Sequence, residues 1–312
     1  MKVLIIDAFP EDFLQALAAL PVEVSYRPQD QRSDILPQLA AAEILVMNSK
    51  IRLDREAIDA APQLKLVLRA GVGMDHIEVA YLEERGVIVR NTIGANADAV
   101  GEQTVGMLLA LRHWIVRADQ QVRQFQWKRA ENRGREIGGK TIGLIGYGHT
   151  GKAVARKLSG FGCRVLAYDK YLTDYGDAYA TEASLDQIFA EAEVCSLHIP
   201  LTEETHKYAD AAFFARFAQP IFFLNLARGP ITDLPALLAA LDREQVLGAA
   251  LDVLENEKLP TLTDAQRAAY TELFARPNVI ITPHIGGWSF ESRQNINQRL
   301  LAEIKALLEA SL

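Results

Sequence analysis

The chain has 312 residues, which is enough for two domains with substantial hydrophobic cores. Hydrophobic residues make up 49% and charged residues 23%, as in ordinary globular proteins, and no apolar run reaches membrane-spanning length. The net charge of −7 disfavours nucleic acid or an anionic membrane as a partner. The two cysteines, Cys163 and Cys195, lack the spacing of metal ligands, and the start resembles a strand rather than a signal peptide. We therefore expect a cytoplasmic protein without a metal site.

The first ninety residues alternate apolar and amphipathic segments. Strand patterns occur at Val3–Ile6, Val22–Tyr26, Ile44–Met47, Leu66–Leu68 and Val87–Val89. Helical patterns between them include Asp12–Leu20, Asp54–Ala61 and Glu78–Arg85. Such alternation predicts a parallel sheet that is covered by helices on both faces.

One long helical pattern, from about Asn96 to Gln126, follows this first series. It is longer than most globular helices, so we expect it to bridge two domains or to pack against a second subunit. Strand patterns then recur at Thr141–Ile145, Arg164–Tyr168, Val194–His198, Ile221–Leu226, Val246–Val253 and Val279–Thr282, and a helical pattern runs from Ser289 onward. The sequence therefore predicts two α/β domains in tandem, with the reaction in the cleft between them.

The second series opens with a glycine-rich turn between a strand and a helix. It reads Gly146-Tyr147-Gly148-His149-Thr150-Gly151. The first glycine permits a tight turn, the second lets a pyrophosphate approach bare backbone, and the third lets the helix pack on the strand. The next strand ends at Asp169, which is placed to accept hydrogen bonds from the adenosine ribose and to repel a 2′-phosphate. The pattern predicts binding of NAD in preference to NADP.

Polar residues follow three later strands of the same series. Arg228 comes after Ile221–Leu226, Glu255 and Glu257 follow Asp252, and His284 follows Val279–Thr282. Ligands of open parallel sheets bind beyond the carboxyl ends of the strands. An imidazole that titrates near neutrality, a carboxylate to orient it and a guanidinium to hold a substrate carboxylate would suit the oxidation of a hydroxyacid.

These residues belong to a set of motifs that resembles the NAD-dependent D-2-hydroxyacid dehydrogenases over nearly the whole chain. The motifs include Arg69–Asp75, Asn91–Asn96, the glycine-rich turn, His198–Thr202, Asn225–Gly229, Leu251–Val253 and Thr282–Gly286. The resemblance implies two doubly wound parallel-sheet domains. A flavodoxin-like substrate domain would comprise residues 1–94 and 287–312, and a Rossmann NAD-binding domain would comprise residues 95–286. It also implies a homodimer formed through the NAD-binding domains.

The resemblance also implies roles for individual residues. Arg228, Glu257 and His284 would form the catalytic trio, although Glu255 is an alternative partner for the histidine because Lys258 departs from the family pattern. Besides the turn and Asp169, the expected cofactor-lining residues are Thr104, His198, Pro200, Thr205, Ala227, Asp252 and Gly287. The expected substrate-binding residues are Lys50, Arg69, Ala70, Gly71, Val72 and Gly73, of which Lys50 also departs from the pattern and could be a solvated cation.

The substrate is expected to be a small hydroxyacid or ketoacid. Arg69, with Lys50 and Arg52 to balance a phosphate, favours oxidation of 3-phosphoglycerate to 3-phosphohydroxypyruvate. The alternative within the family is a glyoxylate or hydroxypyruvate reductase. An alternative of another class is an NAD-sensing, corepressor-like scaffold that binds a partner protein.

Overall fold

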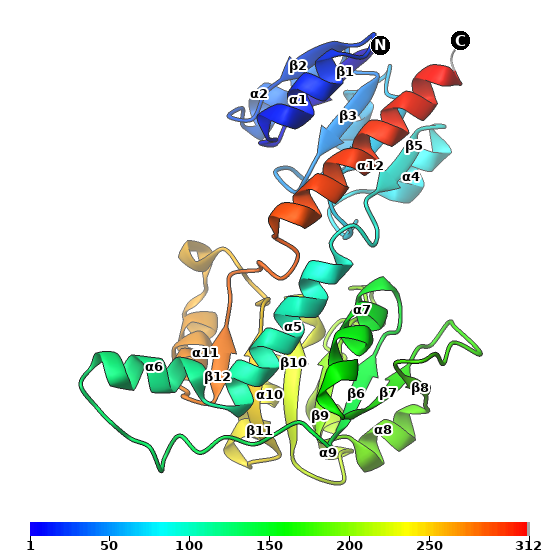
Figure 1. Cartoon of the computed structure of the whole chain (residues 1–312). Helices are drawn as coiled ribbons and strands as arrows, with labels where there is room; N and C mark the ends of the chain where they lie inside the picture. The colour runs from blue at the N-terminus through cyan, green and yellow to red at the C-terminus, as the bar shows by residue number, and fades with distance from the viewer. Residues whose placement is uncertain (311–312) are drawn as a thin grey trace. The chain divides into compact units, whose positions relative to one another are not determined.

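The computed structural model describes residues 1–310, which form two compact units (Figure 1). The first unit consists of Met1–Asn96 together with the chain from Phe290 onward, and the second unit is Ala97–Ser289. The boundaries expected from the sequence, after residues 94 and 286, lie close to these points. None of the helices in the described part of the chain is long and apolar enough to cross a lipid bilayer.

The first unit contains a five-stranded parallel sheet in the order β2-β1-β3-β4-β5, which is the doubly wound order of flavodoxin-like folds. Its strands are β1 (Lys2–Ile5), β2 (Glu23–Tyr26), β3 (Ile44–Met47), β4 (Leu66–Arg69) and β5 (Ile88–Asn91). Its helices are α1 (Glu11–Ala18), α2 (Arg32–Leu39), α3 (Arg55–Asp59), α4 (Val79–Glu84) and α12 (Phe290–Glu309). Helix α2 was not among the sequence predictions.

Different helices cover the two faces of this sheet. Apolar side chains of α2, α3 and α4 join one buried cluster, whose members include Ile35, Ile58 and Leu82. Side chains of α1 and α12 join the cluster on the other face, with Phe13 and Leu300 among them. The C-terminal helix is thus part of the core of the first unit.

The second unit contains a seven-stranded parallel sheet in the order β12-β11-β10-β9-β6-β7-β8, which extends the Rossmann arrangement by one strand. Its strands are β6 (Thr141–Ile145), β7 (Arg164–Tyr168), β8 (Thr181–Glu182), β9 (Val194–Leu197), β10 (Ile221–Asn225), β11 (Val246–Leu251) and β12 (Val279–Ile281). Its helices are α5 (Ala97–Arg112), α6 (Ile115–Arg123), α7 (His149–Leu158), α8 (Leu185–Glu191), α9 (Ala211–Ala215), α10 (Leu234–Asp242) and α11 (Asp264–Phe274), with 3₁₀ turns at Ser159–Phe161, Gly229–Ile231 and Leu259–Thr261. Helices α5 and α7 cover one face, and α8 to α11 cover the other.

The single helix predicted from Asn96 to Gln126 is wrong, because the structure divides it into α5 and α6. The break lies at Trp114, whose φ of 57° is left-handed. Tertiary contacts explain the break. The Arg135 N–H donates to the Arg112 carbonyl, and the Arg112 guanidinium donates to the carbonyls of Arg135 and Glu136. The last carbonyl of α5 is therefore already engaged, and the helix ends there.

Candidate active site

The glycine-rich turn has the shape that a bound pyrophosphate requires. Gly146 has a φ of +96°, and a Cβ added there would lie 2.5 Å from the carbonyl oxygen of His198. A Cβ at Gly151 would lie 2.2 Å from the Gly146 carbonyl oxygen, so that glycine permits close packing of helix on strand. A Cβ at Gly148 would meet nothing within 4 Å. The backbone at Gly148 is therefore open, at the N-terminus of the ten-residue helix α7, where N–H groups favour an anion.

Asp169 lies at the end of β7 with its carboxylate held by backbone donors. Oδ2 accepts from the Tyr147 N–H at 2.9 Å, and Oδ1 accepts from the N–H groups of Tyr171 and Leu172 at 3.0 and 3.3 Å. The Tyr175 hydroxyl accepts from the Asp169 N–H and donates to the carbonyl of Ala167. These contacts fix the carboxylate beside the glycine-rich turn, where ribose hydroxyls are recognised in Rossmann folds.

Two buried tyrosines support Asp169 and the glycine-rich turn. Tyr147 was expected to line the cofactor as part of the turn, and Tyr175 was not among the predicted site residues. Tyr147, within the turn, is fully buried, and its hydroxyl donates to Asp177 Oδ1 at 2.9 Å. Burial, followed by the hydrogen bond to Asp177, raises the pKa of Tyr147. The ring centroids of Tyr147 and Tyr175 lie 5.7 Å apart. No signal in the sequence pairs Tyr147 with a residue thirty positions away.

The other expected cofactor-lining residues include several in the loop after β9 and one, Thr104, inside helix α5. The Thr205 hydroxyl donates to the Pro200 carbonyl within the loop after β9. His198 pairs through Nε2 with the Ser196 hydroxyl at 2.9 Å, and burial lowers its pKa to about 4. Its Nδ1 has no hydrogen-bond partner within residues 1–310. Thr104 is 2% exposed and donates to the Val100 carbonyl inside α5, so its hydroxyl is already engaged.

A histidine and a glutamate meet beyond the ends of β11 and β12. His284 Nδ1 lies 2.9 Å from Glu257 Oε2, and both side chains are a little under half exposed. The structure thus pairs Glu257 with the histidine and leaves Glu255 exposed in the same loop. Tyr270 on α11 holds this loop, because its hydroxyl accepts from the Asn256 N–H and donates to the Asn256 carbonyl.

Arg228 lies in the loop just after β10, the strand that pairs with β11 in the sheet. The register aligns Asn225 with Leu251 and Leu251 with Ile281, so the three exits lie side by side. The buried Asn225 amide shapes the arginine loop by donating to the Arg228 carbonyl and accepting from the Ala227 N–H. A Cβ at Gly229 would lie 2.0 Å from the Leu254 carbonyl. The arginine loop therefore packs directly against the loop that carries Glu257.

The buried Asp252 carboxylate holds the turn that carries His284, which we call the histidine turn. Asp252 is 2% exposed, and its carboxylate accepts from the Thr282 hydroxyl, from the Ile285 N–H at 2.9 Å and from the Gly286 N–H at 2.7 Å. The Asp252 carbonyl accepts from the His284 N–H at 2.8 Å. His284 itself has a left-handed φ of 56°, which is costly for a residue with a side chain. Asp252, expected at the nicotinamide end, thus anchors the backbone of that turn.

In the first unit, the Arg69–Gly73 loop leaves β4 with an unusual arrangement. Gly71 has a φ of +151°, and a Cβ added to it would lie 1.3 Å from Arg69 Nη1, so the guanidinium folds over this glycine. The carbonyls of Gly71 and Val72 accept from the Thr92 N–H and the Asn91 side chain. The N–H groups of Val72 and Gly73 donate to no acceptor within the described residues. They are suited to binding an anion.

Lys50 lies at the carboxyl edge of the same sheet, but its ammonium is engaged. Nζ donates to the Ile6 carbonyl at 2.9 Å and to the Pro28 carbonyl. Of the three donors of a lysine ammonium, these contacts leave one for a ligand. Arg52 is exposed. The engagement of Lys50 weakens the expectation that its ammonium helps to balance a substrate phosphate.

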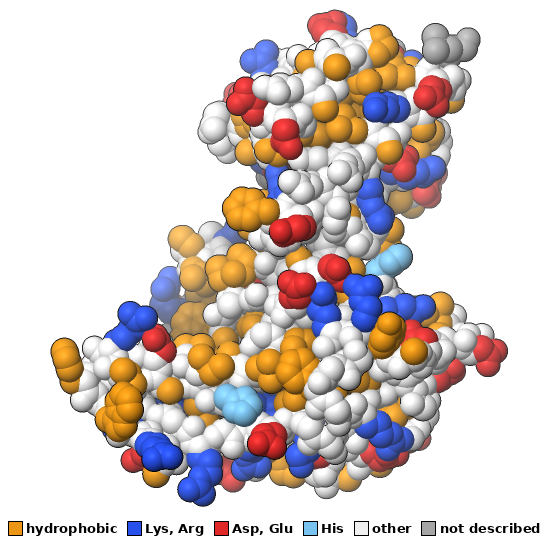
Figure 2. All heavy atoms as spheres, in the orientation of Figure 1, with side chains coloured by type: hydrophobic (Ala, Val, Ile, Leu, Met, Phe, Trp, Pro, Cys, Tyr) orange, Lys and Arg blue, Asp and Glu red, His pale blue; other side chains and the backbone are white. Residues whose placement is uncertain are grey.

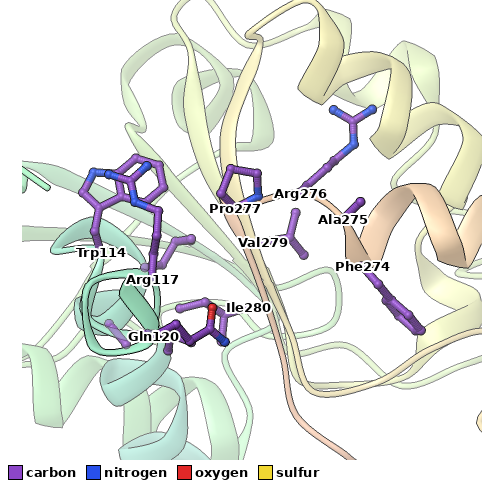
Figure 3. Close-up of a pocket in the computed structure, with 12 residues that line it drawn as sticks. Trp114, Arg117, Gln120, Phe274, Ala275, Arg276, Pro277, Val279 and Ile280 are labelled. Atoms are coloured by element: carbon purple, nitrogen blue, oxygen red, sulfur yellow. The ribbon is translucent and has the colours of Figure 1, made fainter. Parts of the chain in front are cut away.

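The second unit also has a cavity that none of the predicted site residues lines. Its volume is about 260 Å³, and it lies between the α5–α6 junction and the α11–β12 connection (Figure 3). Trp114 and Arg117 stack on one side, with the guanidinium carbon 3.6 Å from the ring centroid, and Phe274 to Pro277 line the other. This cavity is therefore separate from the predicted site residues.

Comparisons with known proteins agree with this geometry. The model of the "D-isomer specific 2-hydroxyacid dehydrogenase, NAD binding domain" family matches residues 105–286. A hydroxypyruvate reductase of Thermotoga maritima is 34% identical over 91% of this chain and 90% of its own length. A D-3-phosphoglycerate dehydrogenase of Mycobacterium tuberculosis is 34% identical over 98% of this chain, which spans only 56% of that relative. The crystal structure of an Aquifex aeolicus D-lactate dehydrogenase complexed with NAD and lactic acid has a TM-score of 0.87 at 28% identity, covering 99% of this chain and 96% of that chain.

The fold is that of a two-domain, NAD-binding oxidoreductase. The chain belongs to the D-isomer specific 2-hydroxyacid dehydrogenases. It is an NAD-dependent enzyme, and the prediction of two parallel-sheet α/β domains from the sequence is confirmed.

Proposed function

We propose that His284 is the general acid–base of this dehydrogenase, with Glu257 as its partner and Arg228 as the ligand of the substrate carboxylate and carbonyl. The hydrogen bond between His284 and Glu257, at adjacent strand exits in the NAD-binding unit, is the observation that carries this proposal. Bound NAD acts as the hydride acceptor in oxidation, and NADH acts as the hydride donor in reduction. Gly148, the start of α7 and Asp169 have the geometry to hold its pyrophosphate and adenosine ribose.

The glutamate determines which imidazole nitrogen does the chemistry. With Nδ1–H donating to Glu257, Nε2 is left to exchange a proton with substrate. In the oxidative direction Nε2 takes the hydroxyl proton, and the carboxylate stabilises the resulting imidazolium. In the reductive direction the same nitrogen returns the proton to the forming hydroxyl. Arg228 offers a planar fork of donors, which suits a carboxylate and polarises the neighbouring carbonyl oxygen.

We infer that the preferred substrate is a small, unphosphorylated 2-ketoacid such as hydroxypyruvate, reduced to its D-2-hydroxyacid. Free N–H groups at Val72 and Gly73 support binding of one carboxylate. The commitment of Lys50 to two backbone carbonyls argues against a built phosphate site. The near full-length match to a hydroxypyruvate reductase points the same way. Oxidation of 3-phosphoglycerate is the second candidate, favoured by the Arg69 guanidinium over Gly71.

A panel of acids tests these assignments. Initial rates at 340 nm are measured with hydroxypyruvate, glyoxylate and pyruvate plus NADH, and with 3-phosphoglycerate plus NAD. We expect hydroxypyruvate to give the highest kcat/KM, and His284→Ala to abolish turnover while NAD still binds. Turnover of 3-phosphoglycerate above all ketoacids would favour the second candidate. NAD binding without turnover of any acid would overturn the proposal in favour of the corepressor-like scaffold.

We also propose a cytoplasmic homodimer formed through the NAD-binding units. Support comes from an unusual display of apolar side chains on α6 and the segment after it, which Figure 2 shows as hydrophobic surface. Phe125 is fully exposed and Trp127 is 83% exposed. Large apolar groups left in water at this density mark an interaction surface. Light scattering of the wild-type chain should give twice the mass of one chain, and Phe125→Asp with Trp127→Asp should shift it towards the monomer.

A further inference from the structure

An ion pair joins the two loops that flank the glycine-rich turn. Lys170, directly after Asp169, donates through Nζ to Glu204 Oε1 in the loop after β9. Strands β7 and β9 lie on opposite sides of β6 in the sheet. Their ends are therefore two strand spacings apart, about 10 Å. The two long side chains meet across the exit of the strand that leads into the glycine-rich turn.

The loop that carries Glu204 is ordered by its own hydrogen bonds. The Thr202 N–H donates to the Thr205 hydroxyl at 2.7 Å, and the Thr205 N–H donates to the Thr202 hydroxyl at 3.2 Å. The Thr205 hydroxyl donates to the Pro200 carbonyl at 2.6 Å. Glu204 is thus presented from a fixed turn. The hydrogen bond to Glu204 is also the main cause of the raised pKa of Lys170.

The position of Lys170 matters because of what NADP adds to NAD. NADP carries a phosphate on the adenosine ribose, and Rossmann proteins that accept it place a basic residue close to the end of the second strand. Lys170 follows Asp169 at that place, and about half of its side chain is exposed. Its charge is engaged by Glu204, whereas the Asp169 carboxylate is fixed by three N–H groups and would repel the phosphate.

We propose that Glu204 is a specificity-determining residue, which keeps Lys170 away from a ribose 2′-phosphate and thereby reinforces the preference for NAD. This inference rests on the proposed adenosine site at Asp169. The preference then has two parts: Asp169 repels the phosphate, and Glu204 removes the neighbouring cation that would otherwise attract it.

The test uses two nucleotides that lack nicotinamide, ADP and 2′,5′-ADP, titrated calorimetrically into the full chain. In Glu204→Gln the lysine is released, and one charge-assisted hydrogen bond to the phosphate becomes available. We expect 2′,5′-ADP to bind about five- to tenfold more tightly than to the wild type. The Kd of ADP should stay within about twofold, because the ribose and pyrophosphate contacts are unchanged.

Two further variants separate release of Lys170 from a simple loss of negative charge. Glu203→Gln removes the same charge one residue away, where the glutamate is exposed and forms no ion pair within the described residues. It should leave both Kd values unchanged. Adding Lys170→Met to Glu204→Gln should cancel the gain, because the gain depends on the lysine.

Several outcomes would overturn the proposal. These are an unchanged Kd of 2′,5′-ADP in Glu204→Gln, an equal gain in Glu203→Gln, and a gain that survives in the double variant. Failure of ADP to bind the wild-type chain would overturn it too, because no adenosine site would exist. Neither probe undergoes turnover, so a negative result in the acid panel leaves this inference standing.

Discussion

Replacing Asp252 by asparagine tests whether the backbone of the histidine turn is held by this buried carboxylate. The side chain keeps its size, but one of its two acceptor oxygens becomes an NH₂ donor. The oxygen that remains can still accept from the Thr282 hydroxyl and the Ile285 N–H. The new amide then faces the Gly286 N–H, now donor against donor, where Oδ2 accepted at 2.7 Å.

The expected effect follows from two terms. A buried N–H left without an acceptor costs about 1–3 kcal/mol. The left-handed conformation of His284 adds about 1–2 kcal/mol that favours relaxation of the turn once the anchor weakens. If misalignment of the imidazole raises the activation free energy by about 1.4–2.7 kcal/mol of this total, kcat falls about 10- to 100-fold. KM for the ketoacid should change little, because Arg228 and the Arg69–Gly73 loop are untouched.

Steady-state kinetics of Asp252→Asn and its melting temperature are the measurements. Glu255→Gln is the matched control, because it removes one charge from an exposed position in the adjoining loop, and it should match the wild type. If Asp252→Asn melts at a lower temperature but keeps kcat within about twofold, the anchor supports only the fold and the reasoning is refuted.

Three more predictions concern residues around the site. Glu257→Gln should lower kcat about 10- to 100-fold, because an amide cannot stabilise an imidazolium as a carboxylate does, and equal losses in Glu255→Gln would contradict the pairing. Gly71→Ala should raise KM at least about tenfold, because the new Cβ would lie 1.3 Å from Arg69 Nη1; an unchanged KM would show that the guanidinium is not needed. Burial lowers the pKa of His198 from 6.5 to about 4, so the unfolded state binds more protons in this window and the free energy of unfolding should drop by about 2 kcal/mol from pH 7 to pH 5. Urea denaturation at the two pH values measures the drop, which His198→Gln should diminish.

Much of the architecture could be read from the sequence because its signals are local. Apolar runs bounded by turn residues marked most strands, and Thr141–Ile145 and Arg164–Tyr168 were predicted with their observed bounds. Because parallel strands share one carboxyl edge, the exits carrying Glu257 and His284 could be expected to meet. The family resemblance already favoured Glu257 over Glu255, and the loop geometry, in which Tyr270 holds Asn256, shows the contact between Glu257 and His284.

Tertiary contacts explain what the sequence could not show. No proline or glycine marks the break at Trp114, because the contacts that end α5 come from Arg135 and Glu136. Lys50 follows the end of a strand, as a ligand-binding cation would. Its ammonium nevertheless donates hydrogen bonds to the carbonyls of Ile6 and Pro28. Such competition between backbone acceptors and a ligand becomes visible only when distant segments are seen together.

The discontinuity of the first unit has a consequence for synthesis. Ile296, Leu300 and Ile304 of α12 fill the cluster that also contains Phe13 and Leu17, so this half of the core is encoded at opposite ends of the described chain. A ribosome must translate the whole contiguous second unit before those side chains can be covered. During that interval the face of the sheet that α12 later covers stays partly exposed, and such apolar surface favours aggregation of the nascent chain.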